Sequence, residues 1–288
     1  MEDPRSLLKQ AIAFELALQG PYVPIEPAKP EERAAAVADE TPPLAITPVD
    51  PAPLPPPSPI DTPQRPMTEP HAGAPETPPR AQDGSPYKRI EALIAPTSPL
   101  HAMTTLDEVR DYVASTVLIP LDTTRINPVF GVGNPHADLM VIGEAPGADE
   151  DQKGEPFVGR AGQLLTKILE AIHFTRDDVY IANILKSRPP NNRDPLPDEV
   201  AAHIPILYKQ IALIQPKLIL CVGKTAGNNL LEKQVTLASL RGKFNDFHGI
   251  PTMVTYHPAA LLRNPQWKRP TWEDVQMLRD KYDELTAP

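Results

Sequence analysis

Residues 143–151 combine a glycine-rich turn with a run of acidic side chains. The segment reads Gly143-Glu144-Ala145-Pro146-Gly147-Ala148-Asp149-Glu150-Asp151. Turns of this kind bring bare backbone amides close to a flat polar ligand and set carboxylates around it. The segment lacks the Lys-Ser/Thr pair of a P-loop and the glycine spacing of dinucleotide folds, and its acids would repel phosphate. It is therefore either a catalytic loop or a plain structural turn.

Phe157 follows in a second glycine cluster, which opens a helix. It lies between Pro156 and Val158, in a segment rich in polar residues. A ring in such a loop can stack on a nucleobase, a contact worth about 1–3 kcal/mol. A ring that anchors the loop on the core is the alternative interpretation.

Asn183 interrupts an apolar run at residues 179–184. A buried Asn needs partners for both its carbonyl and its amide group. One possibility is that nearby backbone satisfies it. The more specific hypothesis is a bidentate contact to a pyrimidine edge, in which Asn183 accepts from N3–H and donates to O4.

His257 lies between the apolar run 252–255 and Pro258, and a short apolar segment with Arg263 behind it follows. A lone histidine is most often a structural residue with satisfied hydrogen bonds. A polar tip next to an apolar wedge is also what an enzyme needs to push into a DNA stack.

Continuous apolar runs alternate with helical patterns over the second half of the chain. We expect strands at about 137–142, 179–184, 217–222 and 252–255, and helices at about 105–115, 162–171, 198–214, 225–231 and 271–285. This alternation predicts a three-layer α/β/α sandwich with a mainly parallel central sheet. Ligands of such folds bind at the carboxyl ends of strands. Glu144, Asn183 and His257 all lie at such ends, so we expect them at one edge.

Composition divides the chain. Residues 1–87 hold 21 of the 39 prolines and almost no aromatic residues. Such a segment cannot bury enough apolar surface to offset chain entropy. We expect a short amphipathic helix at 1–20, a disordered Pro/Ala-rich linker at 21–100 and one folded domain at 101–288. The proline-rich region is either plain linker or a docking site for a protein partner.

The net charge of −9 lies mostly in the same region, because residues 1–87 carry 13 acidic and 6 basic side chains. The near-neutral remainder can still bind DNA if its bases cluster on one face. No apolar stretch approaches the ~18 residues of a membrane helix, so we expect no membrane association. The single cysteine, Cys221, excludes an intramolecular disulfide, and we expect it to be buried in a strand. These features are typical of a reduced, cytoplasmic protein.

As an ordered set, these motifs resemble family 4 of the uracil-DNA glycosylase superfamily, the type-4 enzymes. The matching stretches are 129–135, 143–151, 154–165, 183–193, 255–263 and 268–273. The resemblance implies hydrolysis of the N-glycosidic bond of deoxyuridine in DNA, which leaves an abasic site. The base is first flipped out of the duplex, at a cost of a few kcal/mol. Uracil-containing DNA is then the expected partner, and we expect the protein to be a monomer.

The resemblance also implies roles for individual residues. The implied catalytic residues are His257, which donates to uracil O2, and Glu144 or Glu150, which positions water or stabilises the cationic sugar. For the base, it implies stacking on Phe157, edge recognition by Asn183 and backbone contacts from Ala145 and Gly147. For DNA, it implies a wedge at Leu261 and phosphate contacts from Arg263, Lys268 and Arg269.

One departure from the family concerns its cofactor. Type-4 enzymes carry a [4Fe–4S] cluster on four cysteines, and the matching positions here hold Thr116, Ile119, Ser187 and His203. Because these clusters need thiolate ligands, we expect no cofactor. Ile119 suggests that apolar packing refills the space. An inactive or weak DNA-binding relative that acts as an interaction protein is the alternative function, and a hydrolase for another small ligand is a third.

Overall fold

A computed structural model describes residues 85–287, so the helix expected at 1–20 and most of the expected linker lie outside the described residues. Residues 85–100, which we assigned to the linker, are instead part of the fold. They contain helix α3 (Pro86–Glu91), and Ile90 and Ile94 are buried in the core. The high proline content of the segment before them masked these two apolar residues. The folded domain therefore begins before residue 101.

The centre of the fold is a six-stranded sheet with the order β1-β3-β2-β4-β6-β5. Four strands are parallel: β2 (Leu139–Gly143), β3 (Tyr180–Asn183), β4 (Leu218–Val222) and β6 (Ile250–Thr255). The antiparallel edges are β1 (Val132–Gly133) and β5 (Phe244–Phe247). The prediction of a mainly parallel sheet is confirmed. The edge strands were not predicted, because one is two residues long and the other is only partly buried.

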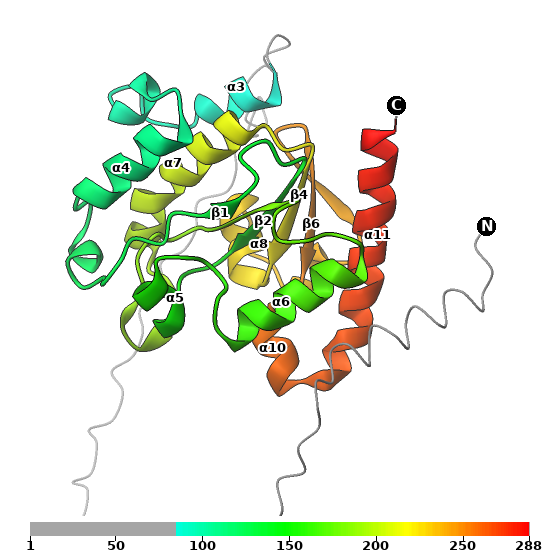
Figure 1. Cartoon of the computed structure of the whole chain (residues 1–288). Coiled ribbons are helices and arrows are strands. Elements are labelled where there is room, and N and C mark those ends of the chain that lie inside the picture. The colour runs from blue at the N-terminus through cyan, green and yellow to red at the C-terminus, as the bar shows by residue number, and fades with distance from the viewer. Residues whose placement is uncertain (1–84, 288) are drawn as a thin grey trace, which may run out of the picture. The chain divides into compact units, whose positions relative to one another are not determined.

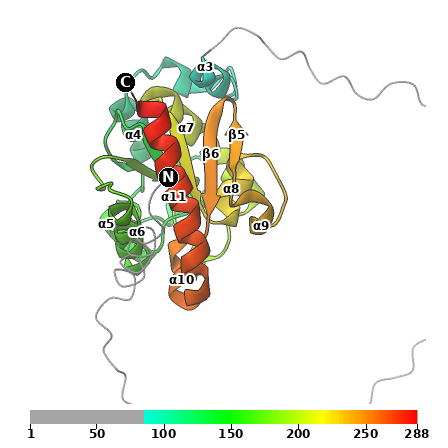
Figure 2. The ribbon, with the colours of Figure 1, turned by 90° about the vertical axis from the view of Figure 1, so that its right-hand side faces the viewer.

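Alternate residues of each central strand face two separate hydrophobic clusters. Met140 and Ile142 of β2 belong to one cluster, and Leu139 and Val141 belong to the other. This period of two places helices on both faces of the sheet, which confirms the three-layer sandwich (Figures 1 and 2).

One cluster contains residues of α3, α4 (Leu106–Ser115), α7 (Pro197–Ile214), α8 (Lys224–Leu230) and α9 (Leu237–Leu240). The other contains residues of α6 (Arg160–Ala171), α10 (Pro258–Arg263) and α11 (Lys268–Thr286). Short 3-10 turns connect these elements: η1 (Pro99–Ala102), η2 (Pro120–Thr123), η3 (Pro190–Asn192) and η4 (Pro265–Trp267). None of the described helices is long and apolar enough to cross a membrane.

The acidic run after the glycine turn forms a short helix, α5 (Ala148–Lys153). Asp149, Glu150 and Asp151 fill its first turn, where carboxylates interact favourably with the exposed N–H groups. Cys221 is fully buried in β4, as expected. The glycine turn leads directly from the carboxyl end of β2 into α5, so both lie at the edge where the parallel strands end.

Candidate functional site

A cavity of about 520 Å³ opens at the carboxyl ends of the parallel strands. Its lining includes Glu144, Phe157, Asn183 and His257. The parallel topology brings Glu144, Asn183 and His257 together, because β2, β3 and β6 all end at this edge. Phe157 comes from the loop between α5 and α6. The volume lies within the range of about 300–1,000 Å³ that is usual for small-ligand sites.

Asn183 is the most telling residue of this cavity. It ends β3 opposite Gly143 of β2 and is 1% exposed. Its Oδ1 atom is buried and has no hydrogen-bond partner among the described residues. Leaving a buried acceptor unpaired costs about 1–3 kcal/mol. No described backbone group donates to Oδ1, so the alternative in which nearby backbone satisfies this atom does not hold. A ligand N–H group would satisfy it.

Gly143 makes room for this arrangement. A Cβ atom at this position would lie 2.3 Å from Asn183 Oδ1 and 2.5 Å from Phe157 Cζ. Both distances are far inside van der Waals contact. The glycine therefore allows the amide and the ring to share the floor of the cavity.

Phe157 fits both interpretations of its ring. It is 6% exposed and belongs to the hydrophobic core, and it also lines the cavity. Its backbone has a positive φ of 55°, which is strained for a residue other than glycine. Arg176 holds the loop by donating to the carbonyl oxygens of Phe157 (3.2 Å) and Pro156 (2.9 Å). Arg176 was not predicted, because it follows the loop in sequence by about 20 residues.

His257 is held as a neutral hydrogen-bond donor. Its Nδ1 accepts from the backbone N–H of Ala259 at 3.2 Å, so the ring proton lies on Nε2. Burial lowers the pKa of His257 to about 4; Arg263 acts in the same direction and Glu150 opposes it. The ring lies beside Phe157, with 5.6 Å between the ring centroids.

Glu150 links the glycine turn before α5 to the loop before α6. Its Oε2 accepts from the backbone N–H of Gly147 at 3.1 Å. Its Oε1 accepts from Val158 at 2.9 Å and from Gly159 at 3.0 Å. The N–H of Gly147 is therefore already engaged, which corrects the expectation that it contacts the base. Ala145, which also lines the cavity, remains the candidate for that backbone contact.

Glu144 has a different environment from Glu150. Burial raises its pKa above the usual value, and Asp194 adds to this effect. A hydrogen bond from Thr225 and the charge of Lys224 oppose the rise without cancelling it. A half-buried carboxylate with spare acceptor capacity, lining the cavity, is suited to orient water or to face a developing positive charge.

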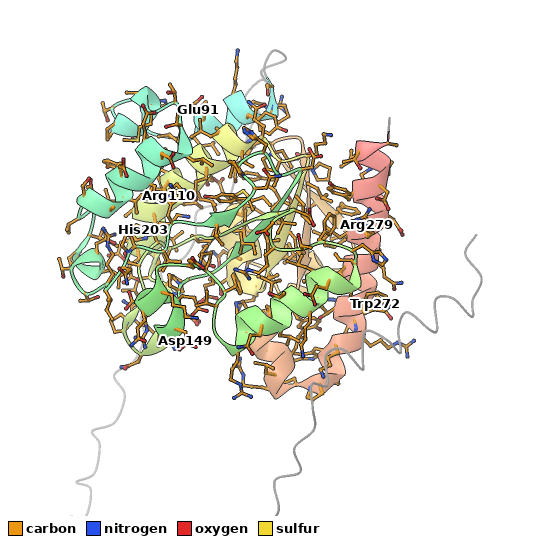
Figure 3. All side chains as sticks on the ribbon, viewed as in Figure 1. Glu91, Arg110, Asp149, His203, Trp272 and Arg279 are labelled. Carbon is orange, nitrogen blue, oxygen red and sulfur yellow. The ribbon has the colours of Figure 1, made fainter. Side chains whose placement is uncertain are left out.

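The structure corrects the expected DNA wedge. Leu261 is fully buried in the core, whereas Leu262 is 43% exposed. Residues 258–263 form helix α10, so successive side chains point about 100° apart around its axis. Leu261 therefore faces the core cluster that also contains Trp272 of α11 (labelled in Figure 3), and it cannot enter a DNA stack without leaving that core.

The expected phosphate contacts separate into two groups. Arg263 is exposed and lines the cavity. Lys268 and Arg269 begin α11 and are not part of the cavity lining. Arg269 forms an ion pair with Glu273 at 3.4 Å, and its side chain is 83% exposed, so it is accessible to a polyanion.

Several lining residues had no assigned role in the sequence. The polar and charged ones include Asp149 and Arg160 next to the glycine turns, and Asn192, Arg193 and Asp194 in the loop after β3, which Pro189 begins (Asp149 is labelled in Figure 3). Arg193 is held by Glu199 of α7, at 2.5 Å between Nη2 and Oε1. The adjacent prolines and the length of this polar loop were the signals that could have identified it.

The four positions that match the family's cluster cysteines lie around a buried carboxylate, Asp122. Ser187 and His203 hydrogen-bond to its Oδ1, and the backbone N–H of Ile119 donates to its Oδ2. Thr116 joins this group through its backbone carbonyl, which accepts a hydrogen bond from Arg125, the ion-pair partner of Asp122. These residues supply hydroxyl and imidazole groups but no thiolate. They do not fit a [4Fe–4S] cluster.

The expected apolar refilling of this space is only partly right. Ile119 is half-buried and packs against the core. The centre of the space is polar, however, because the buried Asp122 carboxylate stands there. No set of three His, Cys, Asp or Glu side chains within residues 85–287 could hold a metal ion.

Comparison with known proteins covers this same region. The family model "Uracil DNA glycosylase superfamily" matches residues 130–276. The chain is 41% identical to the Type-4 uracil-DNA glycosylase of Archaeoglobus fulgidus over 184 residues, which are 61% of this chain and 92% of that relative. It is 41% identical to that of Saccharolobus solfataricus over 187 residues, 62% of this chain and 87% of the relative.

A third relative, the Type-4 uracil-DNA glycosylase of Thermotoga maritima, is 41% identical over 175 residues, 59% of this chain and 91% of the relative. The family match contains β2 to β6 and every residue that lines the cavity. Fold, cavity and sequence identity agree. The chain belongs to the uracil-DNA glycosylase superfamily.

Proposed function

We propose that this protein removes uracil from DNA by hydrolysing the N-glycosidic bond of a flipped deoxyuridine, which leaves an abasic site. The observation that carries the proposal is that Asn183 lines the cavity and that its buried Oδ1 atom has no hydrogen-bond partner among the described residues. Uracil offers an N3–H donor for this oxygen and an O4 acceptor for the amide nitrogen. Cytosine presents the reverse pattern at both positions, so an amide that turns Oδ1 toward N3 and Nδ2 toward O4 favours uracil.

Catalysis follows from the groups around that base. Phe157 supplies a stacking surface, and the backbone N–H of Ala145 contacts a base carbonyl. The Nε2–H of His257 donates to uracil O2 as negative charge builds on the leaving base, which stabilises the transition state more than the ground state. Glu144 orients the attacking water or stabilises the cationic sugar, since Glu150 is already occupied by three backbone N–H groups.

DNA is held from the edge of the cavity. Arg263, Lys268 and Arg269 contact phosphates, which makes the affinity fall as salt rises. Leu262 takes the place of Leu261 as the wedge, because it is the exposed leucine of α10. We propose that the glycosylase domain begins near residue 85 and that it acts as a cytoplasmic monomer. The proline-rich segment before it is either a plain linker or a docking site for a protein partner.

The proposed enzyme needs no iron–sulfur cluster. One cysteine cannot supply the four thiolates of a [4Fe–4S] centre. Protein purified without air should contain no stoichiometric iron and lack the broad absorbance near ~400 nm of such clusters. Stoichiometric iron together with that absorbance would overturn this part of the proposal.

A labelled oligonucleotide with one uracil tests the function directly. The wild-type protein should produce alkali-sensitive strand cleavage at the uracil. Asn183→Ala and His257→Ala should each lower the single-turnover rate by at least ~10-fold. His136→Ala, at an exposed position outside the cavity, is the matched control and should keep the wild-type rate. Binding without cleavage would support the inactive relative. The absence of both binding and cleavage would favour a hydrolase for another ligand.

A further inference from the structure

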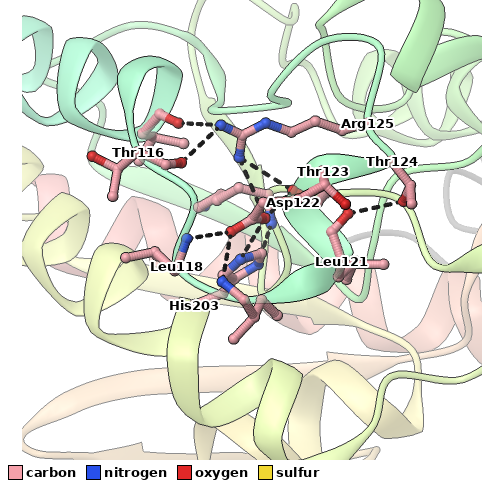
Figure 4. A network of polar contacts seen from close by, with 12 residues as sticks. Thr116, Leu118, Leu121, Asp122, Thr123, Thr124, Arg125 and His203 are labelled. Atoms are coloured by element: carbon pink, nitrogen blue, oxygen red, sulfur yellow. Dashed lines mark hydrogen bonds and ion pairs between the residues drawn. The ribbon is translucent and has the colours of Figure 1, made fainter.

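A buried network of polar groups surrounds Asp122, away from the cavity itself (Figure 4). The Asp122 side chain is fully buried. Its Oδ2 accepts from the backbone N–H groups of Leu118 (2.9 Å) and Ile119 (3.3 Å). Its Oδ1 accepts from Ser187 Oγ at 2.5 Å and meets His203 Nε2 at 3.1 Å. Both carboxylate oxygens are therefore fully used.

Arg125 balances the charge of this carboxylate. Its Nη1 lies 3.3 Å from Asp122 Oδ1 and the same distance from Ser187 Oγ. Its Nη2 donates to the carbonyls of Val113 and Thr116, at 2.5 and 3.1 Å, at the end of α4. Burial acts to raise the pKa of Asp122, but hydrogen bonds from His203 and Ser187 outweigh it and hold the pKa well below its usual value. A buried ion pair persists when all its groups are satisfied in this way.

The network reaches the wall of the cavity formed by the loop after β3. Ser187 lies two residues before Pro189, which begins the lining part of this loop. The preceding backbone N–H, that of Lys186, donates to His203 Nδ1 at 3.0 Å. His203 thus bridges this backbone and Asp122 with its two ring nitrogens. The start of the loop is held by both a side-chain bond and a main-chain bond.

The same network also reaches α5, whose residues line the cavity, through the residues after Arg125. The backbone N–H of Ile126 donates to Asp151 Oδ1 at 2.9 Å. Asn127 Nδ2 donates to the carbonyls of Asp151 (3.0 Å) and Gln152 (2.9 Å). These acceptors belong to α5, the helix that carries Glu150. A chain of hydrogen bonds, buried around Asp122 and more exposed at Asn127, therefore links the 187–194 loop to α5.

We infer that Asp122, Arg125, Ser187 and His203 form a metal-free bracket, which holds the 187–194 loop against α5 in place of the family's cluster. Asp122 is a positioning residue of this bracket: it touches no substrate, and it aligns the loop that lines the cavity. The donor chemistry supports the inference, because protein donors occupy both oxygens of Asp122 and none of these donors is a thiolate. The activity readout below rests on the proposed function.

Asp122→Asn tests the bracket because it keeps the shape of the side chain and removes its charge. The variant leaves Arg125 without its counter-ion, so amides of the 186–194 segment should exchange with solvent at least ~10-fold faster than in the wild type. The exchange of α11 amides should stay unchanged. The kcat/KM for uracil release should fall by at least ~10-fold, since misplaced cavity walls weaken base positioning.

Two further variants make the result decisive. Leu278→Ala deletes a buried side chain of α11, on the other face of the sheet, and serves as the control that loses global stability only. Its kcat/KM should stay within ~3-fold of the wild type at a temperature where all the proteins are folded. Ser187→Ala removes one bond of the bracket without removing a charge and should show a smaller change of the same kind, which keeps the test open if Asp122→Asn does not fold.

The outcomes separate the two proposals. If the wild-type protein releases no uracil, the proposed function fails, and the exchange of the 186–194 amides still decides the bracket. If the wild type is active but Asp122→Asn and Ser187→Ala match Leu278→Ala in both exchange and kcat/KM, the bracket inference is overturned.

Discussion

Glu144 and His257 face the same cavity, and their pKa values are shifted in opposite directions. Burial raises the pKa of Glu144 above 4.5, whereas burial lowers that of His257 to about 4. Water positioning needs the ionised carboxylate, and donation to uracil O2 needs only the neutral imidazole. The ionised Glu144 is lost as the pH falls, whereas protonation of His257 occurs at Nδ1 and breaks its hydrogen bond with the Ala259 N–H.

This order gives a prediction for the pH profile. The kcat/KM of the wild type should be level near neutral pH and should fall on the acid side as Glu144 takes up a proton, before His257 does so near pH 4. Glu144→Gln should lower the rate at neutral pH and remove the first fall. A variant that keeps the wild-type acid limb would show that another group titrates there.

Gly143 offers a second prediction at a single residue. Gly143→Ala places a Cβ 2.3 Å from Asn183 Oδ1 and 2.5 Å from Phe157 Cζ, so the amide or the ring must move. Uracil release should fall by at least ~10-fold. Gly242→Ala is the control: its φ of 69° strains the alanine, but no atom lies within 4 Å of the new Cβ. Equal rates in the two variants would contradict the proposed contact between Asn183 and the base.

At the scale of secondary-structure elements, two neighbouring leucines of α10 have different expected roles. Leu261 is buried in the core, and Leu262 is exposed and is the proposed DNA wedge. Leu261→Ala should lower the free energy of unfolding by about 2–5 kcal/mol, because it opens a cavity in the core. Leu262→Ala should leave the free energy of unfolding within about 0.5 kcal/mol of the wild type, as is usual for surface positions. Denaturant unfolding of both variants measures this difference.

Activity on duplex and single-stranded substrates completes the comparison of the two leucines. Leu262→Ala should slow uracil release from duplex DNA more than from a single strand, because only the duplex needs a residue to fill the vacated stack. An equal effect on both substrates would exclude Leu262 as the wedge.

At the scale of the whole molecule, charge is unevenly distributed along the chain. Residues 1–87 hold 13 acidic and 6 basic side chains within a chain of net charge −9. Removing residues 1–84 should leave kcat unchanged, because the described cavity lies wholly within residues 144–263. It should tighten DNA binding at low salt, since less negative charge repels the phosphates. Fluorescence anisotropy at two salt concentrations tests this, and tighter DNA binding by the full chain would contradict it.

The sequence by itself determined the layered fold and part of the cavity lining. Apolar runs fixed the parallel strands, and Glu144, Asn183 and His257 stood where those strands end. Parallel topology then required them to meet at one edge, because all carboxyl ends of a parallel sheet point the same way. These inferences depend on local patterns and on one topological rule.

Only the tertiary structure decided which atoms are free and which are already bonded. The rotation of α10 buries Leu261 and exposes Leu262, and three backbone N–H groups occupy Glu150. Asp122 meets partners 65 and 81 positions away in the chain. Such pairings depend on how separate elements pack, and no local pattern of residues encodes them.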